Sequence, residues 1–200
     1  MIILLAIVEF FCGSLMFSYW LGLAMKKDLR TIGDGNPGAI NLWHTAGFKL
    51  GILGIFLDFI KGYFPLVIFI EAGYIKGLEI IPVAIAPVLG HVFSPFLKFK
   101  GGKAIAVTFG VWSAVTRFEV SFIYAIILAI LLILVKVYKK GKPISTEIDA
   151  FMVVLGMAAV FIYLFIRNFP NYMISLWLLN FLILSYRNRE KLYTLFKQMQ

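Results

Sequence analysis

The sequence has little charge for its length. Of its 200 residues, 14% are charged and 62% are hydrophobic, and its mean hydropathy is +0.93. A soluble domain carries roughly a quarter charged residues, so this composition excludes an ordinary soluble fold and predicts an all-α polytopic membrane protein. Because each membrane helix needs about twenty mostly apolar residues, six or seven of them would use nearly the whole chain. We therefore expect one integral-membrane domain over residues 1–200, with any functional site built from short loops and helix ends.

Cysteine is almost absent as well. Cys12 is the single cysteine and lies in an apolar run, which excludes an intrachain disulfide and a cysteine metal site. No basic region precedes the apolar stretch that begins at Ile2, so this stretch is not typical of a cleavable signal peptide. We expect it to remain as the first span.

The apolar runs predict seven transmembrane helices, with six as the alternative. The expected spans are residues 2–25, 48–70, 78–95, 104–116, 120–138, 148–166 and 170–185. The run 104–116 is short for a full crossing, so a re-entrant segment is an alternative there. Pro82 and Pro87 predict a kink in the run 78–95.

Lysine and arginine are unevenly distributed between the loops. With seven spans, most of the 19 lysines and arginines fall in alternate loops on one side of the membrane. Because cytoplasmic loops carry the excess of Lys and Arg, we expect the N-terminus outside and the C-terminus and basic loops in the cytoplasm. Orientation and contact with anionic membrane lipid account for most of the net charge of +9, so this charge does not indicate a nucleic-acid partner.

The first cytoplasmic loop is rich in glycine and asparagine, in the stretch RTIGDGNPGAINLWHTAG at residues 30–47. Glycine lets backbone N–H groups converge on an anion where a Cβ would block the approach, and asparagine adds amide donors. The alternative is a turn-rich connector, although a connector of this length needs far fewer glycines. The candidate binding residues are Arg30, Gly33, Gly35, Asn36, Gly38 and Asn41.

A second basic loop opens the stretch FKGGKAIAVTFG at residues 99–110. Gly101 and Gly102 can form a backbone nest, Lys103 adds a positive charge, and a helix expected to begin at Ala104 adds the positive end of its dipole. Together they predict a phosphate site at the membrane surface. The stretch does not match the nucleotide-binding pattern G-x-x-x-x-G-K-[ST], so nucleotide hydrolysis is not expected.

Two charges lie within an apolar span, and a histidine lies within another. Asp58 and Lys61 are three residues apart, so they can pair on one helix face, either as a structural ion pair or in support of a site. His91 precedes the second basic loop, and it is either a hydrogen-bonded packing residue or a site residue. Asp58, Lys61 and Glu9 would also suit the ion path of a small transporter, but no repeated halves are evident in the sequence.

These stretches together resemble the bacterial acyl-phosphate:glycerol-3-phosphate acyltransferase family. The resemblance covers nearly the whole chain and rests on DLRTIGDGNPGAIN at 28–41, LDFIKGYFP at 57–65 and LGHVFSPFLKFKGGKAIAV at 89–107, with weaker support from GS at 13–14 and YRNRE at 186–190. The chain also lacks a histidine followed five positions later by aspartate, which is the signature of another common class of acyltransferase.

The resemblance implies a multi-pass enzyme of the bacterial inner membrane with seven spans and a cytoplasmic active site. Such enzymes transfer a fatty acyl group from acyl phosphate to the 1-hydroxyl of glycerol 3-phosphate. The products are lysophosphatidic acid and phosphate, as in phospholipid synthesis. The resemblance implies no metal and no cofactor.

Specific roles follow for the two loops. Lys103, Gly101 and Gly102 are expected to bind one phosphate. The residues expected around the other anion are Gly33, Gly35, Asn36 and Gly38, supported by Arg30 and Asn41. His91 is a candidate for orienting a substrate or acting as a base.

The chain departs from the family pattern at several polar positions. Asp34 replaces serine, His44 replaces arginine, Ala104 replaces glycine and Asn188 replaces histidine, and Glu147 lies in a loop that usually offers hydroxyls. A diverged member with another acceptor, or with a non-catalytic lipid-binding role, is therefore an alternative to the standard activity.

Overall fold

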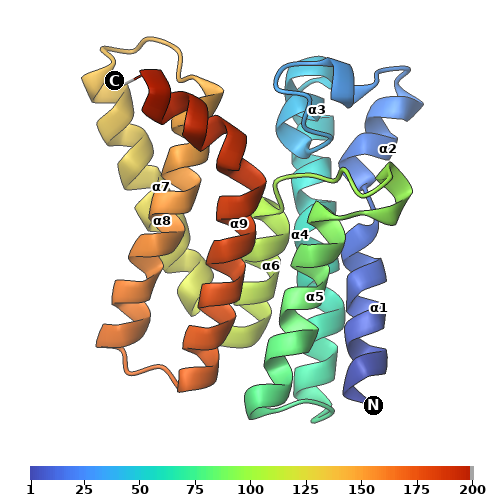
Figure 1. Cartoon of the computed structure of the whole chain (residues 1–200). Helices are drawn as coiled ribbons and strands as arrows, with labels where there is room; N and C mark the ends of the chain where they lie inside the picture. The colour runs from blue at the N-terminus through green and yellow to red at the C-terminus, as the bar shows by residue number, and fades with distance from the viewer. Residues whose placement is uncertain (199–200) are drawn as a thin grey trace. The chain divides into compact units, whose positions relative to one another are not determined.

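The structure is a computed structural model that describes residues 1–198 (Figure 1). Within this range the regular structure is entirely helical, with nine α-helices and three short 3-10 helices, which confirms the predicted all-α class. The α-helices are α1 (Ile2–Ser14), α2 (Phe17–Ala24), α3 (Ala39–Ala46), α4 (Phe48–Glu71), α5 (Ile80–Val92), α6 (Ile105–Thr116), α7 (Glu119–Tyr138), α8 (Thr146–Ile166) and α9 (Asn171–Gln198). The 3-10 helices are Leu29–Thr31, Gly77–Glu79 and Pro95–Leu97.

The chain folds into two compact units. Unit 1 comprises Met1–Arg117 with α1 to α6, and unit 2 begins at Phe118 and contains α7 to α9. In unit 1, α1 packs along α5 and α4 packs along α6, whereas in unit 2 α8 packs against both α7 and α9. The expectation of one domain over residues 1–200 stays a prediction.

Five helical segments in the described part of the chain are long and apolar enough to cross a membrane. They are Ile2–Ala24, Phe48–Glu71, Gly77–Leu97, Glu119–Tyr138 and Thr146–Ile166. The helix α6 has 12 residues and is about 18 Å long, which is shorter than a hydrocarbon core of about 30 Å. The helix α9 is long, but it carries polar residues such as Asn180, Arg187 and Arg189 and is not among the five. Five expected spans are therefore found, and the other two stay predictions.

The first expected span is not one continuous helix, because it breaks between α1 and α2. Leu15 has an extended backbone with φ −63° and ψ 120°, and Met16 has φ −101° and ψ 63°. No proline marks this break in the sequence. Met16 is buried there in an apolar cluster with Tyr19, Leu29, Leu42 and Leu97, so the break turns a hydrophobic side chain into the core of unit 1.

Glycines let the helices of unit 1 approach closely. A Cβ added at Gly90 of α5 would lie 2.0 Å from the carbonyl oxygen of Phe10 in α1, and one at Gly110 of α6 would lie 2.2 Å from that of Phe59 in α4. Small residues at such crossings replace side-chain bulk with direct backbone contact, which is typical of helix packing in membranes. These contacts hold α5 and α6, the two helices that flank the second basic loop.

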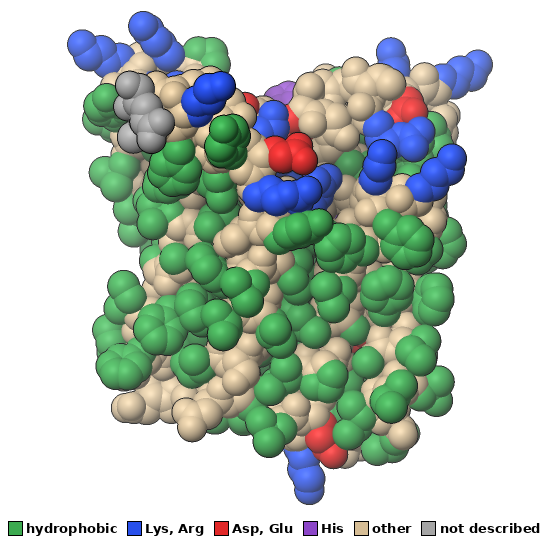
Figure 2. Space-filling model, viewed as in Figure 1, with side chains coloured by type: hydrophobic (Ala, Val, Ile, Leu, Met, Phe, Trp, Pro, Cys, Tyr) green, Lys and Arg blue, Asp and Glu red, His purple; other side chains and the backbone are tan. Residues whose placement is uncertain are grey.

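The side chains are sorted by type along each unit. On the face shown in Figure 2, hydrophobic side chains cover the middle of each unit, and Lys and Arg side chains gather at one end of it. Many of the large hydrophobic residues are exposed, including Phe64, Phe122, Ile133 and Phe165. An apolar belt of this kind beside a basic end is the surface expected of helices that lie in a bilayer.

Candidate active site

The glycine loop, residues 99–104, folds back onto the end of α5. The N–H of Gly101 donates to the carbonyl oxygen of Val92 at 3.0 Å, and the N–H of Gly102 donates to that of His91 at 3.1 Å. A Cβ at Gly101 would lie 1.9 Å from the carbonyl oxygen of His91, so only glycine fits. These backbone bonds place Lys103 two residues before the start of α6.

The start of α6 differs from the expectation by one residue. The helix begins at Ile105, and Ala104 precedes it in the left-handed conformation, with φ 59° and ψ 17°. An L-residue with a Cβ is disfavoured in this conformation, whereas glycine adopts it freely. The backbone therefore explains why the family pattern has glycine here, and it makes Ala104 a strained departure from that pattern.

The first loop, residues 32–38, is organised by a side chain of α3. The Asn41 Nδ2 group lies 2.9 Å from the carbonyl oxygen of Ile32, 3.0 Å from Asp34 Oδ1 and 2.9 Å from the carbonyl oxygen of Asn36. Asn41 is almost fully buried. Its amide nitrogen is therefore used within the loop. Asn41 can support the site only indirectly, by holding the loop in shape.

An ion pair joins the two loops. The Lys103 Nζ atom lies 2.8 Å from Asp34 Oδ2, and the side chains of Lys103 and Asp34 are 16% and 7% exposed. Burial alone raises the pKa of Asp34, but its hydrogen bond to Lys103, the charge of Lys103 and the donors of Asn36 and Asn41 outweigh this and hold the pKa below 3.8. The stabilisation from this pair is therefore present above pH 3.8 and is lost as the pH falls through the lower pKa of the folded state.

The other charged candidate in this region, Arg30, is engaged elsewhere. Its guanidinium donates to both carboxylate oxygens of Asp28, at 3.1 and 2.8 Å, and lies 4.9 Å from the centre of the Tyr19 ring. The Arg30 side chain is 48% exposed. The structure thus brings Lys103 to the first loop, whereas Arg30 binds Asp28.

A buried polar network lies beneath the glycine loop. The Lys61 Nζ atom is 2.7 Å from Asp58 Oδ1 and 2.8 Å from His91 Nδ1, and it also donates to the carbonyl oxygen of Leu15 at the helix break. Ser18 Oγ donates to Asp58 Oδ2 at 2.8 Å. Asp58, Lys61 and His91 are at most 4% exposed. Sequence spacing indicated the Asp58–Lys61 pair, but no sequence signal indicated that Lys61 would reach His91.

In unit 2, polar residues lie in the second half of α9 and at the start of α8. Asn188 is 1% exposed and donates from Nδ2 to the carbonyl oxygen of Leu184 at 2.8 Å. Its Oδ1 atom is buried without a hydrogen-bond partner among the described residues. Nearby in this unit, Lys191 lies 3.4 Å from Glu147 at the start of α8. An unsatisfied buried amide oxygen is uncommon, so Asn188 is a candidate to accept a hydrogen bond from a ligand.

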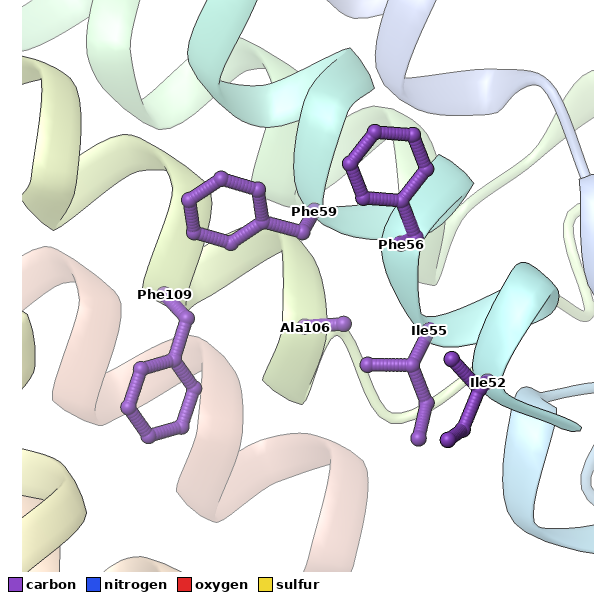
Figure 3. A pocket seen from close by; sticks show the side chains of 6 residues that line it. All are labelled: Ile52, Ile55, Phe56, Phe59, Ala106 and Phe109. Carbon is purple, nitrogen blue, oxygen red and sulfur yellow. The ribbon is translucent and has the colours of Figure 1, made fainter.

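An apolar groove of about 320 Å³ lies between α4 and α6 (Figure 3). Its lining residues are Ile52, Ile55, Phe56, Phe59, Ala106 and Phe109. Phe56 and Ile52 are 55% and 44% exposed, so the groove opens at the surface. Ala106 stands in the first turn of α6, three residues after Lys103. A basic loop therefore precedes the helix that forms one wall of an apolar groove, and sequence patterns did not predict this groove.

Fold and site together define an integral membrane protein with a basic glycine loop close to an apolar groove. The family model described as glycerol-3-phosphate acyltransferase matches residues 3–198. The chain belongs to the glycerol-3-phosphate acyltransferase family, as the sequence motifs predicted. Family membership favours an acyltransferase over the small transporter considered as an alternative.

Relatives of known name share most of the chain. The chain is 42% identical to "Glycerol-3-phosphate acyltransferase 1" of Thermotoga maritima, over 92% of this chain and 93% of that protein. It is 32% identical to "Glycerol-3-phosphate acyltransferase" of Aquifex aeolicus, over 94% and 92%. It is also similar to the crystal structure of PlsY (YgiH), an integral membrane glycerol 3-phosphate acyltransferase, in its glycerol 3-phosphate form. The TM-score of that comparison is 0.83, with 27% identity over 98% of this chain and 92% of that one.

The Asp34–Lys103 pair predicts that removal of the Asp34 charge strengthens anion binding. Asp34→Asn removes the negative charge beside Lys103 but keeps the size of the side chain. We expect inorganic phosphate to bind about three- to tenfold more tightly, because a carboxylate no longer neutralises the ammonium. Titration of the purified protein with phosphate, followed by calorimetry, measures this change.

The matched control is Asp28→Asn, which releases Arg30 instead of Lys103. We expect phosphate affinity to stay within about twofold of wild type in this variant, because exposed ion pairs contribute little. Equal or weaker phosphate binding by a folded Asp34→Asn protein contradicts the interpretation that Asp34 competes with anions for Lys103.

Proposed function

We propose that the chain transfers a fatty acyl group from acyl phosphate to glycerol 3-phosphate, and so forms lysophosphatidic acid and inorganic phosphate for phospholipid synthesis. The hydroxyl oxygen of the acceptor bonds to the acyl carbon, and the bond from that carbon to the phosphate oxygen breaks. The hydroxyl proton leaves with the released phosphate. Support for the acceptor and product comes from the related PlsY structures, which are described as a glycerol 3-phosphate form and a lysophosphatidic acid form.

The observation that carries this proposal is the position of Lys103. It belongs to the glycine loop, pairs with Asp34 of the first loop and precedes α6, whose first turn lines the apolar groove. Acyl phosphate has the matching chemistry, with a phosphate for the loop and an apolar tail for the groove. An acyl phosphate is already activated, so the protein has to align the substrates and stabilise the negative charge that grows on the departing phosphate. The ammonium of Lys103 is suited to this role.

The other expected roles belong to the same proposal. Gly101 and Gly102 hold the loop against α5 so that Lys103 faces the first loop. Asn36 has a buried Oδ1 atom without a partner among the described residues, which suits it to accept a hydrogen bond from an acceptor hydroxyl. The remaining glycines of the first loop, Gly33, Gly35 and Gly38, are proposed to let the backbone approach the second anion. No metal or cofactor is required by this chemistry.

A second candidate function is acyl transfer to an acceptor with less negative charge than glycerol 3-phosphate. The ion pair between Asp34 and Lys103 favours it, because a carboxylate at 2.8 Å already balances the charge of the lysine. A carboxylate also accepts hydrogen bonds from hydroxyl groups, so an uncharged polyol such as glycerol is the acceptor class to compare.

The first test is an assay of purified protein with palmitoyl phosphate and either glycerol 3-phosphate or glycerol. We expect lysophosphatidic acid and phosphate to form in equal amounts with glycerol 3-phosphate. Lys103→Ala is expected to lower the rate about a hundredfold or more, as loss of one charge-stabilising group does elsewhere. Lys49→Ala removes an exposed lysine of α4 and serves as the control.

Two outcomes of this assay would contradict the proposal. Faster turnover with glycerol than with glycerol 3-phosphate would establish the second candidate instead. No product with either acceptor, from folded protein, would leave the chain as a non-catalytic member of the family.

The groove makes a separate prediction about the donor. Phe56→Ala removes a wall of the groove, so we expect the KM for palmitoyl phosphate to rise about three- to fivefold through lost dispersion contacts. The KM for a short-chain donor such as butyryl phosphate should not change. Phe64→Ala is a close control, because Phe64 is 57% exposed on the same helix and does not line the groove. Equal effects of both variants would exclude the groove as the site of the acyl chain.

We also propose seven membrane crossings, with the N-terminus outside and the site on the cytoplasmic side. The short α6 and the apolar first half of α9 supply the two crossings beyond the five long segments. In a Cys12→Ala background, Lys142→Cys should react with a membrane-impermeant maleimide only in inside-out vesicles of the bacterial inner membrane. Lys76→Cys should react only from the opposite side. The reverse pattern, or labelling of both from one side, contradicts this topology.

A further inference from the structure

The buried ammonium of Lys61 has three partners and three protons. Its partners are the carboxylate of Asp58, the carbonyl oxygen of Leu15 and Nδ1 of His91. A lysine ammonium has three donors and no acceptor, and the first two partners are acceptors only. Because the ammonium has no lone pair with which to accept, His91 Nδ1 must be the acceptor in their contact at 2.8 Å. The contact therefore requires Nδ1 to carry no proton.

This requirement fixes the state of the His91 ring. A neutral imidazole carries its proton on one nitrogen, and that nitrogen is a donor while the other is an acceptor. With Nδ1 bound to Lys61, the proton lies on Nε2. A doubly protonated ring would set a second N–H against the ammonium at 2.8 Å, which is unfavourable in a buried site. His91 is therefore neutral, with Nε2 as its donor.

The Nε2 atom of His91 faces the glycine loop. A Cβ added at Gly102 would lie 2.3 Å from His91 Nε2, so the ring packs directly against that residue. The backbone of Gly102 also donates to the carbonyl oxygen of His91. Gly102 is adjacent to Lys103 in the chain, and the N–H of His91 is thus directed toward the loop that is proposed to bind phosphate.

We propose that Lys61 is a positioning residue of the phosphate site and acts through His91. By occupying Nδ1, its ammonium sets the Nε2–H tautomer and presents a donor to the glycine loop. The opposite tautomer would present a lone pair there, and a lone pair repels an anion. The effect on turnover rests on the proposed function, whereas the tautomer and its effect on phosphate binding do not.

The tautomer can be measured directly, because the chain contains two histidines, His44 and His91. Nitrogen NMR of ¹⁵N-histidine-labelled protein in detergent distinguishes a protonated ring nitrogen from an unprotonated one, and His44→Gln assigns the signals of His91. We expect an unprotonated Nδ1 and a protonated Nε2, with the Nε2 signal shifting when inorganic phosphate is added. A proton on Nδ1, protons on both nitrogens, or no response of Nε2 to phosphate would each overturn the proposal.

Two variants test the role of Lys61. Lys61→Met removes the ammonium but leaves Asp58 buried without its counter-charge, which endangers folding. The double variant Asp58→Asn with Lys61→Met removes both charges and avoids that cost. In either folded variant we expect His91 to populate both tautomers and phosphate to bind about tenfold more weakly, as when a hydrogen bond to a charged group is lost.

The control is Lys49→Met, which removes an exposed lysine from the same helix and should change neither quantity. A folded double variant with a wild-type tautomer and wild-type phosphate affinity would refute the positioning role. If wild-type protein shows the expected tautomer and binds phosphate but forms no acyl product, the proposed function fails and the positioning role stands. If neither variant folds, the wild-type tautomer and its response to phosphate decide.

Discussion

The ammonium of Lys61 connects three elements of unit 1 at one buried point. It belongs to α4, it donates to the carbonyl oxygen of Leu15 just after α1 ends, and it contacts His91 in the last turn of α5. An unsatisfied backbone carbonyl is costly away from water, so the helix break at Leu15 depends on this donor. A buried charge is equally costly without partners, so Lys61 depends on Asp58. The helix break at Leu15, the Asp58–Lys61 pair and His91 therefore stabilise one another. The Leu15 carbonyl and the Lys61 charge would each be costly to bury without these partners.

The Lys61 contact with His91 also links this buried point to the glycine loop, which is the more exposed part of the candidate site. His91 supplies a carbonyl oxygen to Gly102 and a ring face to the glycine loop, and the loop in turn places Lys103 opposite Asp34. Unit 1 thus contains two paired lysines, Lys61 and Lys103, whose surroundings differ. Lys61 is enclosed and has its counter-charge within its own helix, whereas Lys103 is partly exposed and has its counter-charge on another loop, where the proposed function has an anionic substrate compete for it.

Several of these features were predictable from the sequence, because they are local. Long apolar runs gave the five long spans, the spacing of Asp58 and Lys61 indicated one helix face, and the motifs identified the family. The helix break was not predicted, since no proline marks it and Gly13 and Ser14, which directly precede it, also occur within continuous helices. The lysine that donates to the carbonyl oxygen of Leu15 is Lys61, 46 residues away. The contact between Lys61 and His91 and the pair between Lys103 and Asp34 are also non-local. They depend on how helices pack, and a hydropathy pattern does not contain that information.

The polar departures from the family pattern have different physical consequences. Ala104 costs backbone strain because its position needs a positive φ. Asp34 accepts a hydrogen bond from Asn41 within the loop and places a negative charge beside Lys103. Asn188 is buried, and its Oδ1 atom has no hydrogen-bond partner among residues 1–198. The scaffold of the family is therefore retained, and each difference changes the backbone strain, the charge or the hydrogen bonding at its own position.

The placement of Asp58 and Lys61 on a single helix also bears on how the chain enters the membrane. The insertion machinery receives α4 as one segment, and a charged residue near the centre of such a segment costs about 3 kcal/mol. Two charges three residues apart can neutralise each other inside that segment without a partner from another helix. The segment can therefore partition into lipid as an overall neutral unit during synthesis. His91 belongs to α5, which follows α4 in the chain, so its contact with Lys61 forms only after α5 has entered as well.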